Sequence, residues 1–125
     1  MKENKISIDQ FNKVKLIVGT IVKAEEFIEA KKAAYKLYID FGEYGKKWSS
    51  AQITQNYEID ELEGIQVIAI MNLGKKNIGK FVSEVLVLGV DDDSSNVVLL
   101  QPDKKIENGA PVSYTHLTLP TNREV

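Results

Sequence analysis

The clearest structural signal in the chain is the run Leu16-Ile-Val-Gly-Thr-Ile-Val-Lys-Ala-Glu-Glu-Phe27. Its β-branched and apolar residues predict a strand. Gly19 interrupts the run, and a glycine inside a strand pattern indicates a bulge or a sharp bend. Such a bend is typical of a strand that coils around a small barrel.

The sequence after this run predicts further short strands. Residues 35–41 alternate with period two, so the apolar positions from Tyr35 to Phe41 face the same side. Residues 42–45 form a turn, 47–53 a third strand, 65–71 a central strand, and 85–90 with 97–100 a hairpin around the loop 91–96. Pro102 and Asn108-Gly109 are expected to end the regular structure.

Two short helical segments complete this pattern. One begins near Ser7, with Gln10 as its capping-box partner, and the other is a single turn within residues 57–62. Five or six short strands with so little helix predict a mainly β fold. A small barrel is favoured because closure removes exposed strand edges, and a two-sheet sandwich is the alternative.

The composition sets the broad class of the protein. The 125 residues are 43% hydrophobic and 27% charged, with a net charge of −2, which fits one soluble globular domain. This net charge argues against nucleic-acid binding through total charge, but it allows a local basic patch. The chain starts without an apolar signal-peptide core and contains no run long enough to span a bilayer, so we expect a cytoplasmic location.

The last residues differ from the rest of the chain. The one histidine, His116, the one arginine, Arg123, and three of the five threonines follow Ser113. Residues 112–121 also match one reading frame of a transposon-end adapter used in DNA sequencing libraries. We therefore expect a domain over residues 1–112 and a non-native tail over residues 113–125, and the alternative is a natural polar tail.

No residue pattern indicates an enzyme, a cofactor or a metal site. The chain has no cysteine, which excludes thiol catalysis, disulfides and cysteine-ligated metals. Asp91-Asp-Asp93 lacks the alternate spacing and distal glutamate of a calcium loop, so a solvated hairpin tip is the preferred interpretation. Ser83 stands beside Glu84, but no histidine or lysine base lies at a recognised spacing.

The lysines are grouped near the predicted strand ends. They comprise Lys31, Lys32 and Lys36 around the second strand, Lys46 and Lys47 before the third, and Lys75, Lys76 and Lys80 after the central strand. If a barrel brings these segments together, eight ammonium groups share one region, with Tyr44 and Trp48 close in sequence. Lysines beside aromatic rings suit phosphates and stacked bases, and the alternative is a solvated surface that balances the acidic loops.

Several segments resemble the tRNA-binding domain, an oligonucleotide-binding (OB) fold module that also occurs at the C-terminus of many methionyl-tRNA synthetases. They are residues 11–30, Tyr35 to Gly42, Ser49 to Thr54, Ser83 to Gly89, Val98 to Asp103 and Asn108-Gly109. The resemblance is strongest to the free-standing bacterial branch of this family, the CsaA-like chaperones. It implies a five-stranded OB-fold barrel, a homodimer and no catalytic activity.

The resemblance also implies a binding face for tRNA or peptide. Together with the lysine groups, its candidates are Ser50, Asn72, Lys75, Lys76, Lys80, Ser83, Glu84, Lys31, Lys36, Lys46, Lys47 and Trp48. Asn72 and Ser83 would bond sugar or base edges, and the lysines would contact phosphates. Glu84 has an equally strong alternative role, in which it fixes a loop by accepting main-chain N–H groups.

Two classes of function follow from this resemblance. The first is a CsaA-like homodimeric chaperone that binds unfolded preproteins or peptides in protein export, with the export motor SecA as a further partner. The second is a tRNA-binding protein that acts free or in trans to an aminoacyl-tRNA synthetase. The lack of arginine before the tail favours the first and predicts weak to moderate tRNA binding, because lysine is a point charge rather than a bidentate phosphate clamp.

A third class is a dimeric scaffold without a ligand of its own. In each dimeric case, we expect the dimer surface to include Ile6, Ile8 and Phe11, together with Ile106 and Val112. A barrel of this size has no need to bury these apolar side chains.

Overall fold

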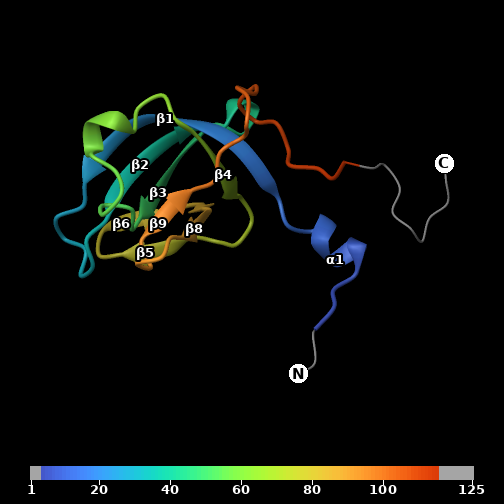
Figure 1. The fold of residues 1–125 in the computed structure, drawn as a ribbon, viewed down its shortest axis with the longest axis horizontal. Coiled ribbons are helices and arrows are strands. Elements are labelled where there is room, and N and C mark those ends of the chain that lie inside the picture. Colours follow the sequence, from blue (N-terminus) through green and yellow to red (C-terminus); the bar gives the residue numbers. More distant parts are fainter. Residues whose placement is uncertain (1–3, 116–125) are drawn as a thin grey trace.

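The computed structural model describes residues 4–115, in which one antiparallel sheet of five strands curls into a nearly closed barrel (Figure 1). The strand order is β3-β2-β1-β4-β7. The strands are β1 (Leu16–Glu26), β2 (Tyr35–Asp40), β3 (Lys46–Ala51), β4 (Gln66–Ile70) and β7 (Leu86–Val87). This architecture confirms the mainly β, five-stranded OB-fold barrel and not the sandwich.

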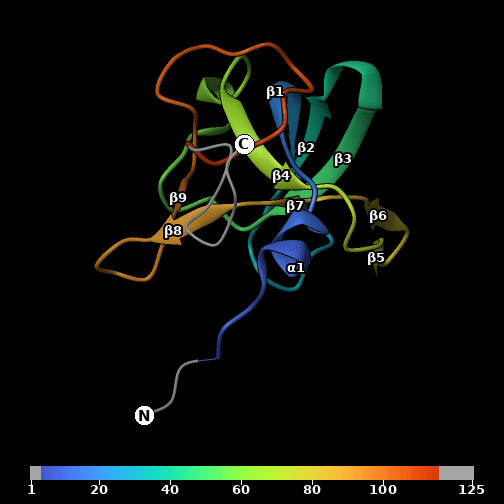
Figure 2. The ribbon, with the colours of Figure 1, turned by 90° about the vertical axis from the view of Figure 1, so that its right-hand side faces the viewer.

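Two small hairpins and three short helical segments accompany the barrel. The hairpins are β5 (Lys76–Ile78) with β6 (Phe81–Ser83), and β8 (Gly89–Asp91) with β9 (Val97–Leu99). The helical segments are α1 (Ile8–Asn12) and the 3-10 turns η1 (Gly42–Tyr44) and η2 (Ile59–Glu61). The predicted capping box of Ser7 and Gln10 begins α1, which lies outside the barrel ahead of β1 (Figure 2). No helix of residues 4–115 is long and apolar enough to cross a membrane.

The long strand β1 serves two neighbours in turn. Its first half pairs with β4 and its second half with β2, and the register shifts between Ile21 and Lys23. The sequence predicts this irregularity at Gly19, but in the structure it lies further along β1, between Ile21 and Lys23. Gly19 has another role, since a Cβ there would lie 2.6 Å from the Phe41 ring and 2.7 Å from Ile39. The ring packs directly on the main chain of β1.

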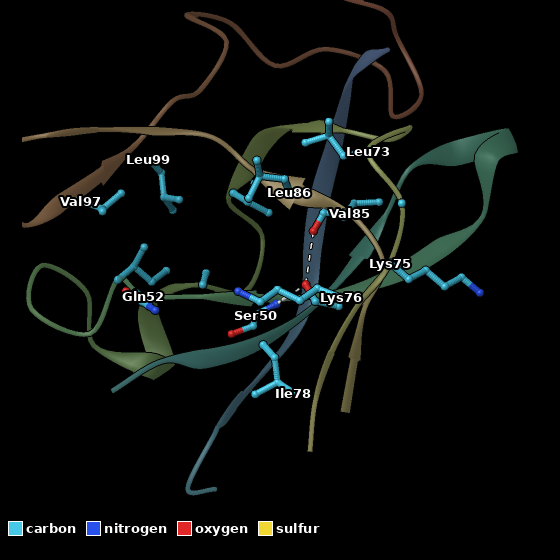
Figure 3. A pocket seen from close by; sticks show the side chains of 15 residues that line it. Ser50, Gln52, Leu73, Lys75, Lys76, Ile78, Val85, Leu86, Val97 and Leu99 are labelled. Carbon is cyan, nitrogen blue, oxygen red and sulfur yellow. Dashed lines mark hydrogen bonds between the residues drawn. The ribbon is translucent and has the colours of Figure 1, made fainter. Parts of the chain in front are cut away.

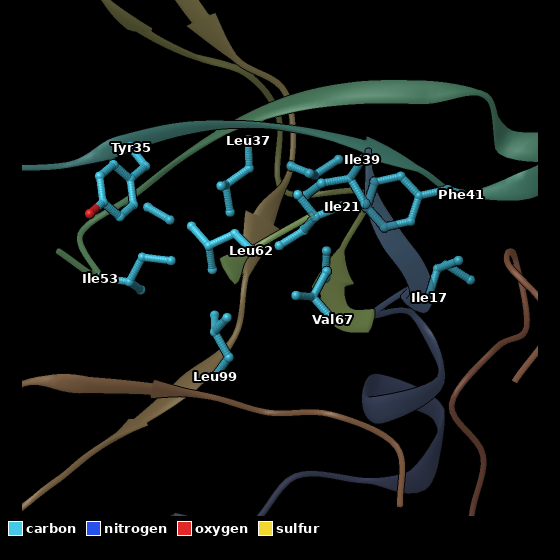
Figure 4. Close-up of a cluster of buried hydrophobic side chains, with 13 residues drawn as sticks. Ile17, Ile21, Tyr35, Leu37, Ile39, Phe41, Ile53, Leu62, Val67 and Leu99 are labelled. Carbon is cyan, nitrogen blue, oxygen red and sulfur yellow. The ribbon is translucent and has the colours of Figure 1, made fainter. Parts of the chain in front are cut away.

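The core lies inside the barrel and confirms the predicted alternation of residues 35–41. Leu37, Ile39 and Phe41 are fully buried, as are Leu62 after η2 and Val67 on β4 (Figure 4). Each barrel strand thus contributes one face to a single hydrophobic cluster.

Three parts of the structure differ from the sequence prediction. The predicted strand 85–90 divides into β7 and β8 at Leu88, whose N–H donates to the Ile68 carbonyl at 2.9 Å while its own carbonyl accepts from Leu100 at 3.2 Å. The hairpin β5–β6 was not predicted. Regular pairing also continues beyond Asn108-Gly109. The Val18 N–H donates to the Ala110 carbonyl at 2.9 Å, and the Val112 N–H donates to the Leu16 carbonyl at 2.8 Å.

Candidate functional site

The barrel closes where β3 meets residues 83–85, a contact called here the seam. One main-chain bond joins them, from the Glu84 N–H to the Trp48 carbonyl at 2.8 Å. Side chains supply two further bonds. The Glu84 carboxylate accepts the Trp48 N–H at 2.9 Å, and the Ser83 hydroxyl accepts the Ser50 N–H at 3.0 Å. The Glu84 carboxylate thus accepts one main-chain N–H, from strand β3, and its role in binding a ligand stays a prediction.

A buried serine completes the seam from the other strand. Ser49 is fully buried, and its hydroxyl donates to the Val85 carbonyl at 2.9 Å. Ser83 is also buried. An apolar substitute for Ser83 would leave the Ser50 N–H without its acceptor, and one for Ser49 would leave the Val85 carbonyl with only the longer bond from Ser83, at 3.4 Å.

A groove of about 440 Å³ opens beside the seam (Figure 3). Its lining is mostly apolar and comes from four parts of the chain, namely residues 50–53, residues 73–76 with Ile78, Ser83 with residues 85–87, and the strand β9 through Val97 and Leu99. Buried Ile53, Val85 and Leu99 belong to the core, whereas Leu73 and Leu86 are 63% and 47% exposed. The groove is therefore an accessible apolar surface of the size that binding sites have.

Two lysines border this apolar surface. Lys76 extends across the groove, and Lys75 points away from it (Figure 3). Both side chains are exposed. Among residues 4–115, ion pairs join Lys23 to Glu25 and Lys36 to Glu29, and no carboxylate pairs with Lys75 or Lys76. The groove thus offers apolar contacts together with free positive charge.

An aromatic cluster covers the outer side of β2 and β3. Tyr38 and Trp48 stack with ring centroids 4.6 Å apart, and Phe81 meets Trp48 edge-on at 6.0 Å. The ammonium of Lys36 lies over the rings of Phe27 and Phe81, at 5.0 and 5.3 Å. This cation–π contact holds Lys36 against the cluster. A second pocket, of about 470 Å³, lies beside Phe27 and Phe81.

The structure divides the predicted binding residues among several places. Ser50, Lys75, Lys76 and Ser83 line the groove. Lys36 and Lys80 line the pocket beside the aromatic cluster, to which Trp48 belongs. In the ladder of β2 and β3, Lys46 lies opposite Asp40 and Lys47 opposite Ile39, at the end of β3 that is far from Ser50. Lys31 lies in the link between β1 and β2. The lysines therefore do not all gather around one site.

Asn72 is engaged within the protein. Its amide oxygen accepts the Lys15 N–H at 2.9 Å, and its amide nitrogen donates to the Lys13 carbonyl at 2.6 Å. Asn72 thereby ties the segment after α1 to the end of β4, and a role in reading a ligand stays a prediction. Tyr44 lies near Lys15, with the ammonium 5.5 Å from its ring, rather than in the aromatic cluster.

Sequence reasoning missed the apolar part of the groove and three of the four rings of the aromatic cluster, those of Phe27, Tyr38 and Phe81. Leu73, Leu86 and Phe81 were not candidates. A signal existed for Phe81, because Gly79-Lys80 between Ile78 and Phe81 is a two-residue hairpin connection that begins with glycine. Leu73 and Leu86 join the groove only through the fold, and no local pattern marks them.

The acidic loop 91–96 is a hydrogen-bonded turn. The Asp92 carboxylate accepts the N–H groups of Ser94 and Asn96, at 2.9 and 3.0 Å, and the Asn56 amide at 3.1 Å. The Asn96 N–H, then the Asn56 amide and the Ser94 N–H, lower the pKa of Asp92 below its usual 3.8. Residues 4–115 contain no group of three or more histidines or carboxylates placed to hold a metal ion.

Comparison with known proteins identifies the relatives of this chain. Two chaperone CsaA crystal structures superpose on it. That from Bacillus anthracis has 44% identity and a TM-score of 0.83, covering 88% of this chain and 100% of the other. That from Picrophilus torridus has 45% identity and a TM-score of 0.81, covering 87% and 100%.

Longer proteins share the same module. A methionine–tRNA ligase of Methanosphaerula palustris is 36% identical over 110 residues, which cover 88% of this chain and 16% of the ligase. The chain spans about a sixth of the length of the curated relatives it matches. The model of one family, described as a putative tRNA binding domain, matches residues 16–111. On this match the chain belongs to the tRNA-binding domain family.

Proposed function

We propose that the protein is a non-enzymatic, CsaA-like homodimeric chaperone that binds apolar segments of unfolded preproteins in protein export. The observation that carries the proposal is the groove, an exposed apolar surface on a chain of this size. Contiguous exposed apolar surface is typical of protein-interaction sites. Two proteins that match over their whole length bear the name chaperone CsaA, and a third, at 27% identity, is a MetRS related protein of Pyrococcus horikoshii, whereas the ligases are about six times longer.

The groove suits a promiscuous peptide ligand. Leu73 and Leu86 offer flexible apolar contacts at its mouth, and the free ammonium of Lys76 can contact a carboxylate or a carbonyl of the bound segment. Within the groove the Ser83 hydroxyl already accepts the Ser50 N–H, so the polar side chains left to a ligand are those of Ser50, Gln52 and the two lysines. Affinity then follows mainly from apolar burial, as a chaperone requires.

The test is binding of a fluorescein-labelled, leucine-rich peptide and of a reduced, carboxymethylated protein, measured by fluorescence anisotropy. Leu86→Ser, which removes an apolar side chain from the groove, should weaken binding of both about fivefold or more. Val90→Ser is the matched control, since Val90 is 53% exposed and lies outside the groove. Equal affinities of the two variants would reject the groove as the binding site.

The homodimer belongs to this proposal. Ile6 and Ile8 are 65% and 37% exposed, and Ile106 and Val112 are 39% and 38% exposed, so the predicted dimer surface presents apolar side chains to solvent. We expect sedimentation at micromolar concentration to give a dimer and Ile6→Asp with Ile8→Asp to give a monomer. SecA would then bind the dimer, which pull-down with purified SecA tests.

The C-terminal tail bears on the same surface. His116 and Arg123 lie outside the described residues. The Tyr114 ring lies 6.3 Å from Phe11, and its hydroxyl lies 3.5 Å from the Asn12 side chain. A non-native tail from residue 113 would thus contact the predicted dimer surface. Sequencing of the source gene beyond the codon for Val112 tests its origin, and a natural continuation through His116 would reject the adapter.

The second candidate function is tRNA binding, free or in trans to an aminoacyl-tRNA synthetase. The family match and the partly buried aromatic cluster beside Lys36 favour it, because aromatic rings and ammonium groups suit bases and phosphates. Anisotropy of labelled tRNA at several salt concentrations tests it. The double variant Lys75→Ala and Lys76→Ala should lower the salt slope by about two, one for each phosphate contact. Lys104→Ala with Lys105→Ala, two exposed lysines that are not among the predicted binding residues, is the matched control.

A further inference from the structure

The strand β5 has an unpaired edge beside the groove. It belongs to a two-stranded sheet, so β6 is its one strand neighbour among the described residues. In an antiparallel ladder the pairs alternate, and the pair next to a two-residue turn is the hydrogen-bonded one. Ile78 and Phe81 flank the turn, so the next pair, Asn77 with Val82, directs its main-chain groups outward. Asn77 is exposed.

The side chains on one face of β5 belong to the groove. Lys76 and Ile78 both line it, and Asn77 between them does not. A chain segment that added to the edge at Asn77 would extend the face formed by Lys76 and Ile78. Every second side chain of that segment would then share the groove with exposed Leu73 and Leu86.

From this arrangement we infer that the groove takes its peptide as an added third strand on β5. The inference rests on the chaperone function proposed above and specifies the class of segment bound, an extended one with alternating apolar side chains and a flanking carboxylate. Main-chain bonds to Asn77 supply affinity that is independent of sequence, and the groove selects apolar side chains. The free ammonium of Lys76 is complementary to the carboxylate.

Peptide chemistry provides the first test. The probe is a fluorescein-labelled peptide of seven residues, in which leucine alternates with threonine after an N-terminal glutamate. Two derivatives carry N-methyl groups at either the odd or the even internal positions. An added strand on β5 uses the N–H groups of one set, so one derivative should bind about tenfold more weakly and the other within about twofold of the probe. Equal affinities of the two derivatives overturn the inference.

A pair of protein variants provides the second test. Asn77→Pro removes the outward N–H, and proline is tolerated where the N–H of an edge strand faces solvent. Asn77→Ala removes the side chain and keeps this N–H. We expect Asn77→Pro to weaken probe binding about fivefold and Asn77→Ala less than twofold. If thermal unfolding shows that Asn77→Pro is misfolded, the N-methyl comparison decides alone.

The remaining outcomes separate this inference from the proposed function. If the unmodified probe and the leucine-rich peptide both fail to bind, the chaperone function fails. If the probe binds, loses affinity on Leu86→Ser and is indifferent to N-methylation and to Asn77→Pro, the groove binds side chains alone and the added strand is wrong. If Asn77→Pro instead changes the sedimentation of the protein alone, a second copy covers the edge, which also overturns the inference.

Discussion

The two sides of the barrel are joined by different kinds of bond. Main-chain ladders run along both edges of β1. The strand β4 pairs with Leu16 to Thr20, and β2 pairs with Thr20 to Glu26. The segment that ends at Val112 bonds to the main chain of Leu16 and Val18. At the seam, the side chains of Ser83 and Glu84 replace most of the ladder. A ladder depends little on side-chain identity, whereas the seam depends on a few polar residues. We therefore expect the barrel to open first at the seam, beside the groove.

The largest expected effect tests the ladder side at its tightest contact. Gly19→Ala places a methyl group 2.6 Å from the Phe41 ring, which is fully buried. We expect a loss of about 3 kcal/mol in the free energy of unfolding, at the upper end for overpacking. Urea unfolding followed by Trp48 fluorescence measures it.

A second substitution shows whether this contact is the cause. Phe41→Leu removes part of the ring that the new methyl group would meet. The double variant with Gly19→Ala should therefore be more stable than the sum of the single losses predicts, by about 1 kcal/mol. Strict additivity would show that Gly19 is needed for its backbone freedom and not for the close approach.

The next effect tests the seam. Ser83→Ala leaves the Ser50 N–H without its acceptor in a part-buried position, and this should cost about 1.5 kcal/mol. Because the groove shares these residues, peptide affinity should fall as well. Hydrogen exchange at the Ser50 amide should accelerate. Ser94→Ala, on an exposed loop, is the control and should stay within about 0.5 kcal/mol of the wild type.

A smaller effect is expected where a side chain joins the ladder side to α1. Asn72→Ala removes two hydrogen bonds to the main chain of Lys13 and Lys15. Because the site is exposed, we expect a loss of about 1 kcal/mol, with faster hydrogen exchange at the Lys15 amide. Unchanged exchange there, combined with weaker tRNA binding, would support the ligand-reading role instead.

The sequence predicts the ladder side far better than the seam. Alternation from Tyr35 to Phe41 is a local signal, and so is the capping box of Ser7. The seam joins Ser50 to Ser83 across 33 positions through a hydroxyl, and no periodicity records such a contact. For the same reason the lysines could be counted but not placed, since Lys36 and Lys46 lie on neighbouring strands and yet near opposite strand ends.

The smallest expected effect concerns the groove in acid. We expect a falling pH to destabilise the groove before it destabilises the main-chain ladders. Asn56 bonds both Asp92 and the carbonyl of Val97, which lines the groove, so this carboxylate helps to hold one groove wall. The folded pKa of Asp92 lies below 3.8. The ionised carboxylate therefore stabilises the fold fully above that pH, and its contribution is lost as the pH falls through the folded pKa.

Asp92→Asn removes the charge and keeps an acceptor for the turn. We expect this variant to have a lower Tm than the wild type at neutral pH, and the difference to shrink as the pH falls below 3.8 through the folded pKa of Asp92. Asp93→Asn, on the same loop, is the control. A constant difference across the titration would mean that packing rather than charge holds the loop, and the groove wall at Val97 would then lose its expected sensitivity to acid.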